Sequence, residues 1–389
     1  MGRSGCLRVL FVLAPIGGGH YSAVRALREA CQELTGSHVE MDVLNVFSNL
    51  CSRFPLTAIP WLYHLFTVKH PWLWRAFYRM TDTPTKFALG EWLAQPFLQP
   101  GLQRYLANWQ PDVVVLAFPA LGHSISRALA TIGSTAPIVT VVTDLVTIHA
   151  SWICNDITAY IVATPAAADA CAAAGIPKER IRCFGLPVPS EFMQPCSDRA
   201  ELRRHLGLDT DAPTVLLMGG GEGSGGLESP VYALADACQT TQIVVITGRN
   251  HALHHRLASR RLAVPCTVLG YVSNVGDWMR ASDLIITKAG PATVMEALYT
   301  GVPMILIGSL PQEVGTVRYI MEHGAARVAS DASEVVTTVT ELLSHPDQME
   351  VIRRNGEILR QVNAAHDIVA FILEVASHGG PAIDVEGSE

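Results

Sequence analysis

The sequence predicts an α/β protein built from two doubly wound, Rossmann-like domains that face each other across a cleft. Short apolar, β-branched runs alternate with helical segments, as in parallel sheets covered by helices on both faces. The pattern stops at a proline-rich stretch around residues 185–197, which is typical of a linker, and then restarts. The length of 389 residues is typical of two or three domains, and two is the simpler division.

The first domain is predicted over residues 1–195. Its opening strand, residues 7–14, leads into a glycine-rich turn and a helix over residues 21–35. The remaining strands are apolar and rich in β-branched residues, and we expect them at 38–46, 112–118, 137–143 and 158–163. An aromatic stretch over residues 54–80 interrupts this alternation.

The second domain is predicted over residues 196–365. Its strands are again short and apolar, and we expect them at 214–218, 242–247, 265–269, 283–287 and 303–307. Residues 366–378 form an amphipathic pattern that predicts a closing helix, and the tail 379–389 has too little apolar content to fold, so we expect it to be disordered. In such folds, ligands bind at the carboxyl ends of the strands.

Composition excludes several classes of protein. A net charge of −7 argues against nucleic acid as the main partner, because proteins that follow the phosphate backbone of a nucleic acid normally carry a positive excess. The nine cysteines are scattered without a C-x-x-C pair or a Cys/His cluster, so we expect neither a disulfide framework nor structural zinc, and a reducing cytoplasm fits best. No apolar run is long enough for a spanning helix, so we expect any membrane contact to be peripheral.

The first glycine loop, Gly17 to Gly19, follows the first strand and is succeeded by His20. Consecutive glycines let the backbone approach a ligand closely, and free helix amides favour negative charge there. The loop lacks the dinucleotide-binding fingerprint. His20 stands where an imidazole can take a proton from an attacking hydroxyl, although a helix-capping histidine explains this loop equally well.

The second glycine loop has six glycines among residues 219–226. This composition favours a loop that wraps a phosphate, with Gly220 and Gly221 supplying backbone and Ser224 a hydroxyl donor. Arg249, after the next strand, places a cation on the same sheet edge. The alternative is a flexible surface turn.

The third signal is the block from Lys288 to Glu296. A strand is followed by a tight turn at Gly290 and Pro291, and the first amides of the next helix are free for a diphosphate. Thr293 and Glu296 share one helix face, where a carboxylate can accept both hydroxyls of a ribose. A capping box is the alternative.

Two further pairs follow strands of the second domain. Tyr271 and Val272 follow the strand at 265–269, and Gln312 and Glu313 follow the strand at 303–307. The amide and the acid of the second pair stand where sugar hydroxyls can be hydrogen-bonded. The residues predicted to bind the donor are therefore Gly19, Gly220, Gly221, Ser224, Arg249, Tyr271, Val272, Lys288, Gly290, Pro291, Thr293, Glu296, Gln312 and Glu313.

The aromatic stretch points to a lipid surface. Between residues 53 and 104 there are six Lys or Arg residues against two acids, a local charge of +4. Aromatic rings settle at the headgroup level and basic side chains attract anionic lipid. The candidate docking residues combine these two properties: Trp61, Tyr63, Trp72, Trp74, Arg75 and Arg79. An aromatic core beneath a long insertion is the alternative.

Five motifs together resemble the monogalactosyldiacylglycerol synthases, relatives of the lipid II-forming peptidoglycan glycosyltransferase. They are GGGH, VVTDL-x3-H-x2-W at 141–152, GGGEGSGG, ITKAGPATVMEAL and LPQEVG, and the resemblance covers most of residues 7–365. It implies a GT-B fold, a UDP-sugar donor, a diacylglycerol acceptor, inversion at the anomeric carbon, and neither a cofactor nor an essential active-site metal.

The resemblance also implies roles. His20 would be the base, Ser224 and Gly290 would hold the diphosphate, and Glu296 the ribose. Gln312 and Glu313 would contact the sugar. On the acceptor side, we expect Asp144 to orient the acceptor or to polarise His20 or His149, with His149 and Trp152 nearby.

The chain departs from the family pattern around Gln312. The family usually has P-G-Q-E followed by G-N, whereas this chain has Leu310-Pro311-Gln312-Glu313 and Gly315-Thr316, so galactose is favoured over glucose only as the family default. A UDP-sugar 2-epimerase and a non-catalytic UDP-sugar-binding peripheral membrane protein are the other hypotheses. We expect the protein at the cytoplasmic face of a membrane, and the sequence leaves its oligomeric state open.

Overall fold

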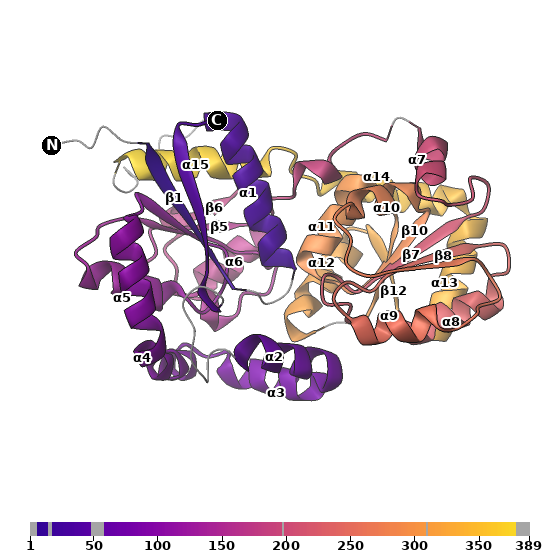
Figure 1. The fold of residues 1–389 in the computed structure, drawn as a ribbon, viewed down its shortest axis with the longest axis horizontal. Helices are drawn as coiled ribbons and strands as arrows, with labels where there is room; N and C mark the ends of the chain where they lie inside the picture. The colour runs from indigo at the N-terminus through magenta and orange to yellow at the C-terminus, as the bar shows by residue number, and fades with distance from the viewer. Residues whose placement is uncertain (1–5, 15–17, 48–57, 197, 309, 379–389) are drawn as a thin grey trace.

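The computed structural model describes residues 6–14, 18–47, 58–196, 198–308 and 310–378 (Figure 1). It confirms the predicted fold class, with two parallel six-stranded sheets that are each covered by helices. The predicted tail at 379–389 and the glycine at position 17 lie outside the described residues, as do residues 54–57 of the aromatic stretch.

The first sheet has the strand order β2-β1-β3-β4-β5-β6. Its strands are β1 Leu7–Leu13, β2 Val39–Asn45, β3 Val113–Leu116, β4 Ile138–Val141, β5 Ala159–Val162 and β6 Ile181–Cys183. Alternate residues of β1 pack into different cores, Leu10 on one face and Phe11 on the other. Burial on both faces explains the continuous apolar runs of this sheet. The sequence did not predict β6, because three residues are too few for a periodic pattern.

Most helices of the first half cover the sheet, but two of them lie away from it. They are α1 Gly19–Thr35, α2 Ile59–His64, η3 Leu65–Lys69, α3 Pro71–Thr81, α4 Pro84–Trp109, α5 Gly122–Thr131, η4 Ala150–Trp152, α6 Pro165–Ala173, η5 Lys178–Arg180 and η6 Ser190–Phe192. In Figure 1, α2 and α3 lie below the junction of the two sheets. The described part of the predicted aromatic stretch is therefore mostly helical.

The second sheet has the order β12-β11-β10-β7-β8-β9. Its strands are β7 Thr214–Met218, β8 Gln242–Ile246, β9 Cys266–Leu269, β10 Leu284–Thr287, β11 Met304–Ile307 and β12 Ala326–Ala329. The sequence did not predict β12, whose short run of alanines and an arginine lacks β-branched residues apart from one valine.

The helices of the second half alternate with these strands. They are α7 Arg199–His205, α8 Glu228–Ala237, α9 His251–Ala258, α10 Val275–Ala281, α11 Pro291–Thr300, η7 Pro311–Glu313, α12 Val314–Glu322, α13 Ala332–Ser344, α14 Pro346–Ile358 and α15 Ala364–His378.

The two halves are joined by packed segments. Leu186, Val188 and Phe192, in the predicted linker, are buried in the same core as Leu145 of the first half and residues of the second. At the other end of the chain, α15 returns to the first half and packs against α1 and β3 (Figure 1). The chain therefore crosses between the halves twice.

Candidate functional site

A cavity of about 980 Å³ lies between the two halves, at the carboxyl ends of both sheets. Twenty of the twenty-four residues that the sequence nominated line it, which brings the three glycine-containing motifs together. These twenty are Gly19, His20, Tyr63, Trp74, Asp144, His149, Trp152, Gly220, Gly221, Ser224, Arg249, Tyr271, Val272, Lys288, Gly290, Pro291, Thr293, Glu296, Gln312 and Glu313. The other four, Trp61, Trp72, Arg75 and Arg79, are exposed and do not line it.

His20 enters the cavity from the first turn of α1. Its Nδ1 lies 3.0 Å from the Thr143 hydroxyl, and its ring meets Phe118 edge-on at 5.1 Å between centroids. Burial lowers the pKa of His20 to about 4, and a hydrogen bond to the backbone of Ala117 acts in the opposite direction. The imidazole is therefore neutral near pH 7, as a general base must be. The N-cap of α1 is Gly18 and no side chain caps it, which removes the capping interpretation.

Asp144 is held by Trp152, whose indole Nε1 donates to its carboxylate at 2.8 Å. Burial raises the pKa of Asp144 to about 6, with the Trp152 hydrogen bond lowering it and the charge of Glu313 raising it. The ring of His20 lies 6.2 Å from that of Trp152, so the indole stands beside both groups. Trp152 thus holds the Asp144 carboxylate, which we expected to orient the acceptor or to polarise His20 or His149.

His149 has a separate set of partners. Its Nδ1 lies 2.8 Å from the Ser151 hydroxyl and its Nε2 lies 3.2 Å from the Tyr78 carbonyl oxygen and 3.8 Å from the Asp82 carboxylate. Its ring packs against that of Tyr78 in a tilted arrangement, with 4.5 Å between the centroids. His149 therefore connects η4 to α3 and fixes the aromatic helices against the first sheet.

The loop 219–226 is folded tightly against the end of β8. A Cβ at Gly223 would stand 2.0 Å from the Thr247 carbonyl oxygen, and one at Gly248 would stand 2.4 Å from that of Gly221. Both residues have positive φ, at 59° and 55°. Only glycine meets both conditions. A flexible surface turn is therefore excluded, and Ser224 is buried within the loop.

The two glycine loops face each other. A Cβ on Gly18 would lie 3.5 Å from the backbone nitrogen of Gly221, and one on Gly19 would lie 3.4 Å from the Cβ of Ala292. At the edge of this region, the guanidinium of Arg249 lies 5.2 Å from the ring centroid of Tyr271. Backbone amides, a helix start and one cation therefore surround the same space.

Lys288 and Glu313 form an ion pair beside the turn at Gly290. Glu313 is only 2% exposed, and its second oxygen accepts from the backbone nitrogen of Leu310 at 2.9 Å. Lys288 is partly exposed, and pairing with it compensates for the burial of the Glu313 carboxylate. The neighbouring Gln312 accepts from the Trp74 indole at 3.0 Å, so α3 contacts the second half of the chain.

Glu296 is buried on α11 and accepts a hydrogen bond of 2.7 Å from Ser22 of α1. Burial raises its pKa to about 7; the Ser22 bond and Arg25 lower it, and Glu191 raises it. Because α11 begins at Pro291, Thr293 lies inside the helix and cannot be its N-cap, so the capping box is excluded.

Three contacting residues escaped the sequence-based selection: Ser22, Thr143 and Tyr78. Thr143 precedes Asp144 within the VVTDL motif, and Ser22 follows His20 by two residues, so both lay beside selected residues. The hydrogen-bond partners of Ser22 and Thr143 lie more than a hundred residues away in the sequence, and no local pattern encodes such pairs.

The aromatic helices have an inner and an outer side. Tyr63 and Trp74 line the cavity and meet edge-on at 5.0 Å, as an aromatic core would. Exposed apolar residues extend beyond the predicted stretch into α4, and they are Trp61, Trp72, Phe77, Met80, Leu89, Trp92, Leu93 and Phe97. Of these, Phe77 also lines the cavity. The stretch therefore supplies part of the cavity wall and also exposes aromatic residues, and its docking to lipid stays a prediction. No helix in the described part of the chain is long and apolar enough to cross a membrane.

Solved structures share this architecture. The UDP-GlcNAc 2-epimerase from Neisseria meningitidis bound to UDP-GlcNAc superposes with a TM-score of 0.61 at 13% identity, covering 95% of this chain and 100% of that one. MurG from Acinetobacter baumannii gives 0.56 at 14% identity, covering 94% and 99%. These similarities establish the GT-B fold.

Sequence relatives are closer. The chain is 32% identical to monogalactosyldiacylglycerol synthase 1, chloroplastic, of Arabidopsis thaliana over 93% of this chain and 70% of that protein. It is 35% identical to a probable monogalactosyldiacylglycerol synthase, chloroplastic, of Glycine max over 91% and 68%. Residues 20–188 match the monogalactosyldiacylglycerol synthase family model, and residues 214–367 match the glycosyltransferase family 28 C-terminal domain. The chain therefore belongs to the monogalactosyldiacylglycerol synthase family.

Proposed function

We propose that the protein transfers galactose from UDP-galactose to the hydroxyl of 1,2-diacylglycerol, with inversion at the anomeric carbon. The observation that carries the proposal is the place of His20. A neutral imidazole stands in one cavity with the glycine loops of the donor half and the aromatic helices of the acceptor half. The names of the sequence relatives supply the donor sugar and the acceptor class.

The donor is assigned to the second half. The amides around Gly221, the hydroxyl of Ser224 and the first turn of α11 would hold the diphosphate, because free backbone amides favour anions. Glu296 would bind the ribose. Gln312 and Glu313 would contact the hexose, and Lys288 forms an ion pair with the buried Glu313.

The transfer is a single displacement. His20 removes the proton from the acceptor hydroxyl, whose oxygen forms a bond to the anomeric carbon. The bond from that carbon to the β-phosphate oxygen breaks, and UDP leaves with the electron pair. The loop amides and the start of α11 stabilise the charge on the leaving diphosphate. This scheme requires no cofactor and no metal ion.

The acceptor is assigned to the aromatic helices. Tyr63, Trp74 and Tyr78 form an apolar wall of the cavity, which suits acyl chains. On the outside, Trp61 and Trp72 would enter the interface of a membrane, and Arg75 and Arg79 would meet anionic headgroups. We infer a peripheral protein at the cytoplasmic face, in keeping with the free thiols of the described cysteines.

The test is an assay of the purified protein with UDP-galactose, UDP-glucose or UDP-N-acetylglucosamine on diacylglycerol vesicles, followed by mass spectrometry of the lipids. We expect monogalactosyldiacylglycerol. A glucosyl product would reassign the donor. Conversion of the nucleotide sugar without a lipid product would indicate an epimerase, and UDP binding without turnover would indicate a non-catalytic protein.

A further inference from the structure

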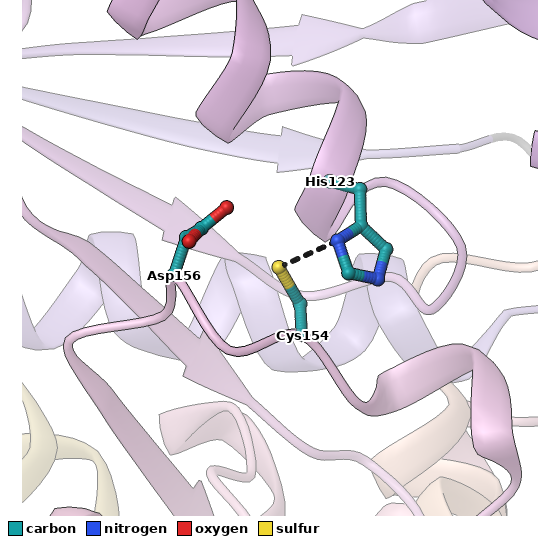
Figure 2. Close-up of side chains that lie close together, drawn as sticks. All are labelled: His123, Cys154 and Asp156. Carbon is teal, nitrogen blue, oxygen red and sulfur yellow. Dashed lines mark hydrogen bonds between the residues drawn. The ribbon is translucent and has the colours of Figure 1, made fainter. Parts of the chain in front are cut away.

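Three side chains outside the cavity, two of them shortly after η4 in the chain, bring together a nitrogen, a sulfur and an oxygen. His123 lies in the first turn of α5, and Cys154 and Asp156 lie in the loop between η4 and β5 (Figure 2). One ligand atom of each residue lies within 4.8 Å of the other two. The sulfur of Cys154 is 3.2 Å from Nδ1 of His123. None of the three is among the residues that line the cavity.

The fold fixes the position of Cys154 from two sides. A Cβ on Gly122 would stand 2.9 Å from the Cβ of Cys154, so the start of α5 lies directly against this residue. On the other side, the hydroxyl of Tyr160 bonds to both the backbone nitrogen and the carbonyl oxygen of Cys154, each at 2.8 Å. The cysteine is therefore held beside His123 by groups buried in the core.

The carboxylate of Asp156 is oriented by a neighbouring side chain. Ser126 donates to the Asp156 carboxylate at 2.7 Å and turns it toward α5, and metal-binding side chains are commonly oriented by such partners.

We propose that His123, Cys154 and Asp156 bind one zinc ion, with water as the fourth ligand. One nitrogen, one sulfur and one oxygen form a donor set that zinc accepts in tetrahedral geometry. On binding, Cys154 releases its proton to solvent and the sulfur bonds to the metal. Asp156 is exposed, and a small rotation of its side chain would close the remaining distance. The residues are up to 33 positions apart, which is why no zinc spacing was visible in the sequence.

The ion would have a structural role. The loop that carries Cys154 and Asp156 directly follows Trp152, which holds Asp144, and His149, which holds α3. A bond from this loop to α5 would fix the acceptor wall of the cavity. It would leave the proposed transfer chemistry without a metal.

The test uses the full chain after dialysis against a chelator. Titration with cobalt should give one equivalent bound, with a near-ultraviolet band from sulfur-to-cobalt charge transfer, and zinc should displace it. At a hundredfold excess of free zinc over its Kd, we expect the Tm to rise by roughly 5–10 °C. Cys154→Ser should abolish the band, and Asp156→Asn should weaken binding at least about tenfold.

Two control variants exclude other sources of binding. His251 and His255 stand four residues apart on the exposed face of α9 and can hold cobalt through imidazoles alone, so His255→Ala must leave the band unchanged. Cys183→Ser, which removes an exposed thiol of the same domain, must also leave it unchanged. Circular dichroism and UDP affinity of the metal-free variants report their folding. If Cys154→Ser does not fold, His123→Gln replaces it, with the same loss expected.

A wild-type chain without the band overturns the proposal. So does a band that survives Cys154→Ser, or a Tm that zinc leaves unchanged. In each of these cases Cys154 and His123 are a hydrogen-bonded pair and nothing more.

Discussion

The hydroxyl of Ser22 donates a hydrogen bond to the carboxylate of Glu296 across the junction of the two halves, at 2.7 Å. Ser22 lies one turn into α1, close to the proposed base His20, whereas Glu296 lies on α11, beside the proposed diphosphate site. One oxygen of Glu296 is thereby engaged by the acceptor half, so we expect the ribose at the other. The contact ties donor binding to the relative position of the two halves.

Donor affinity should therefore depend on pH. Burial raises the pKa of Glu296 to about 7, so its carboxylate forms as the pH rises through that value. Because an ionised carboxylate accepts stronger hydrogen bonds from ribose hydroxyls, UDP affinity should increase from pH 6 to pH 8. Calorimetric titration of UDP at several pH values measures this.

Two variants test whether Glu296 causes this pH dependence of UDP affinity: Ser22→Ala and Glu296→Gln. The Ser22 bond lowers the pKa of Glu296, so Ser22→Ala should move the rise in affinity to higher pH. Glu296→Gln should make affinity independent of pH in this range. An unchanged pH profile in both variants would remove Glu296 from the ribose site.

Replacing His20 tests the base. His20→Ala should lower kcat by about 10²–10⁴-fold, the usual contribution of a general base. UDP affinity should change little, because the donor groups lie on the second half. With a pKa of about 4, His20 is neutral across pH 5–8, so its own titration should not appear in activity measured over that range. Full activity in His20→Ala would exclude it as the base.

The sequence predicted the fold and most of the cavity because both are locally encoded. Apolar runs mark strands, and glycine-rich turns after strands mark the carboxyl edges that meet in the cleft. It missed β6 and β12, which are too short or too poor in β-branched residues to stand out. It also missed Ser22 with Glu296 and Trp74 with Gln312, because each pair depends on how the two halves pack. The cluster at Cys154 was missed because His123 lies more than thirty residues before Cys154, on a different element of the first half.

The ionisation of Asp144 should determine how kcat falls on the acidic side of the pH–activity profile. Burial raises its pKa to about 6, so its carboxylate is present above that pH and lost as the pH falls through it. If the charge orients the acceptor or stabilises the imidazolium of His20, kcat should fall below about pH 6. Steady-state rates between pH 5 and pH 8 measure the limb.

Trp152→Phe provides the comparison. It removes the indole donor but keeps an aromatic ring, and the pKa of Asp144 should rise because that hydrogen bond lowers it. The acidic limb should move to higher pH. Asp144→Asn should abolish the limb together with most of the activity. A limb that stays in place in Trp152→Phe would assign it to another group.

The donor loop should tolerate alanine at one glycine and not at another. Gly223→Ala should abolish UDP binding, because its Cβ would stand 2.0 Å from the Thr247 carbonyl oxygen and its φ is positive. Gly226 also has positive φ, but a Cβ there meets nothing within 4 Å. Gly226→Ala should therefore cost only about 1 kcal/mol of backbone strain. Equal UDP affinity in both variants would contradict the assignment of this loop to phosphate binding.

Vesicle binding should depend on the outward-facing tryptophans. Trp61 and Trp72 are 63% and 66% exposed, and moving each ring from water into the interface should contribute about 1–2 kcal/mol. The double variant Trp61→Ala with Trp72→Ala should weaken binding to anionic vesicles by about 30–1,000-fold, with UDP affinity unchanged.

Arg75→Ala and Arg79→Ala should reduce vesicle binding at low salt more than at high salt, because salt screens exposed charges. Ile358→Ala is the control, since Ile358 is 80% exposed on α14, and its binding should match that of the wild type. If the control loses as much binding as the double variant, the contact is unspecific and α2 and α3 are not the docking surface.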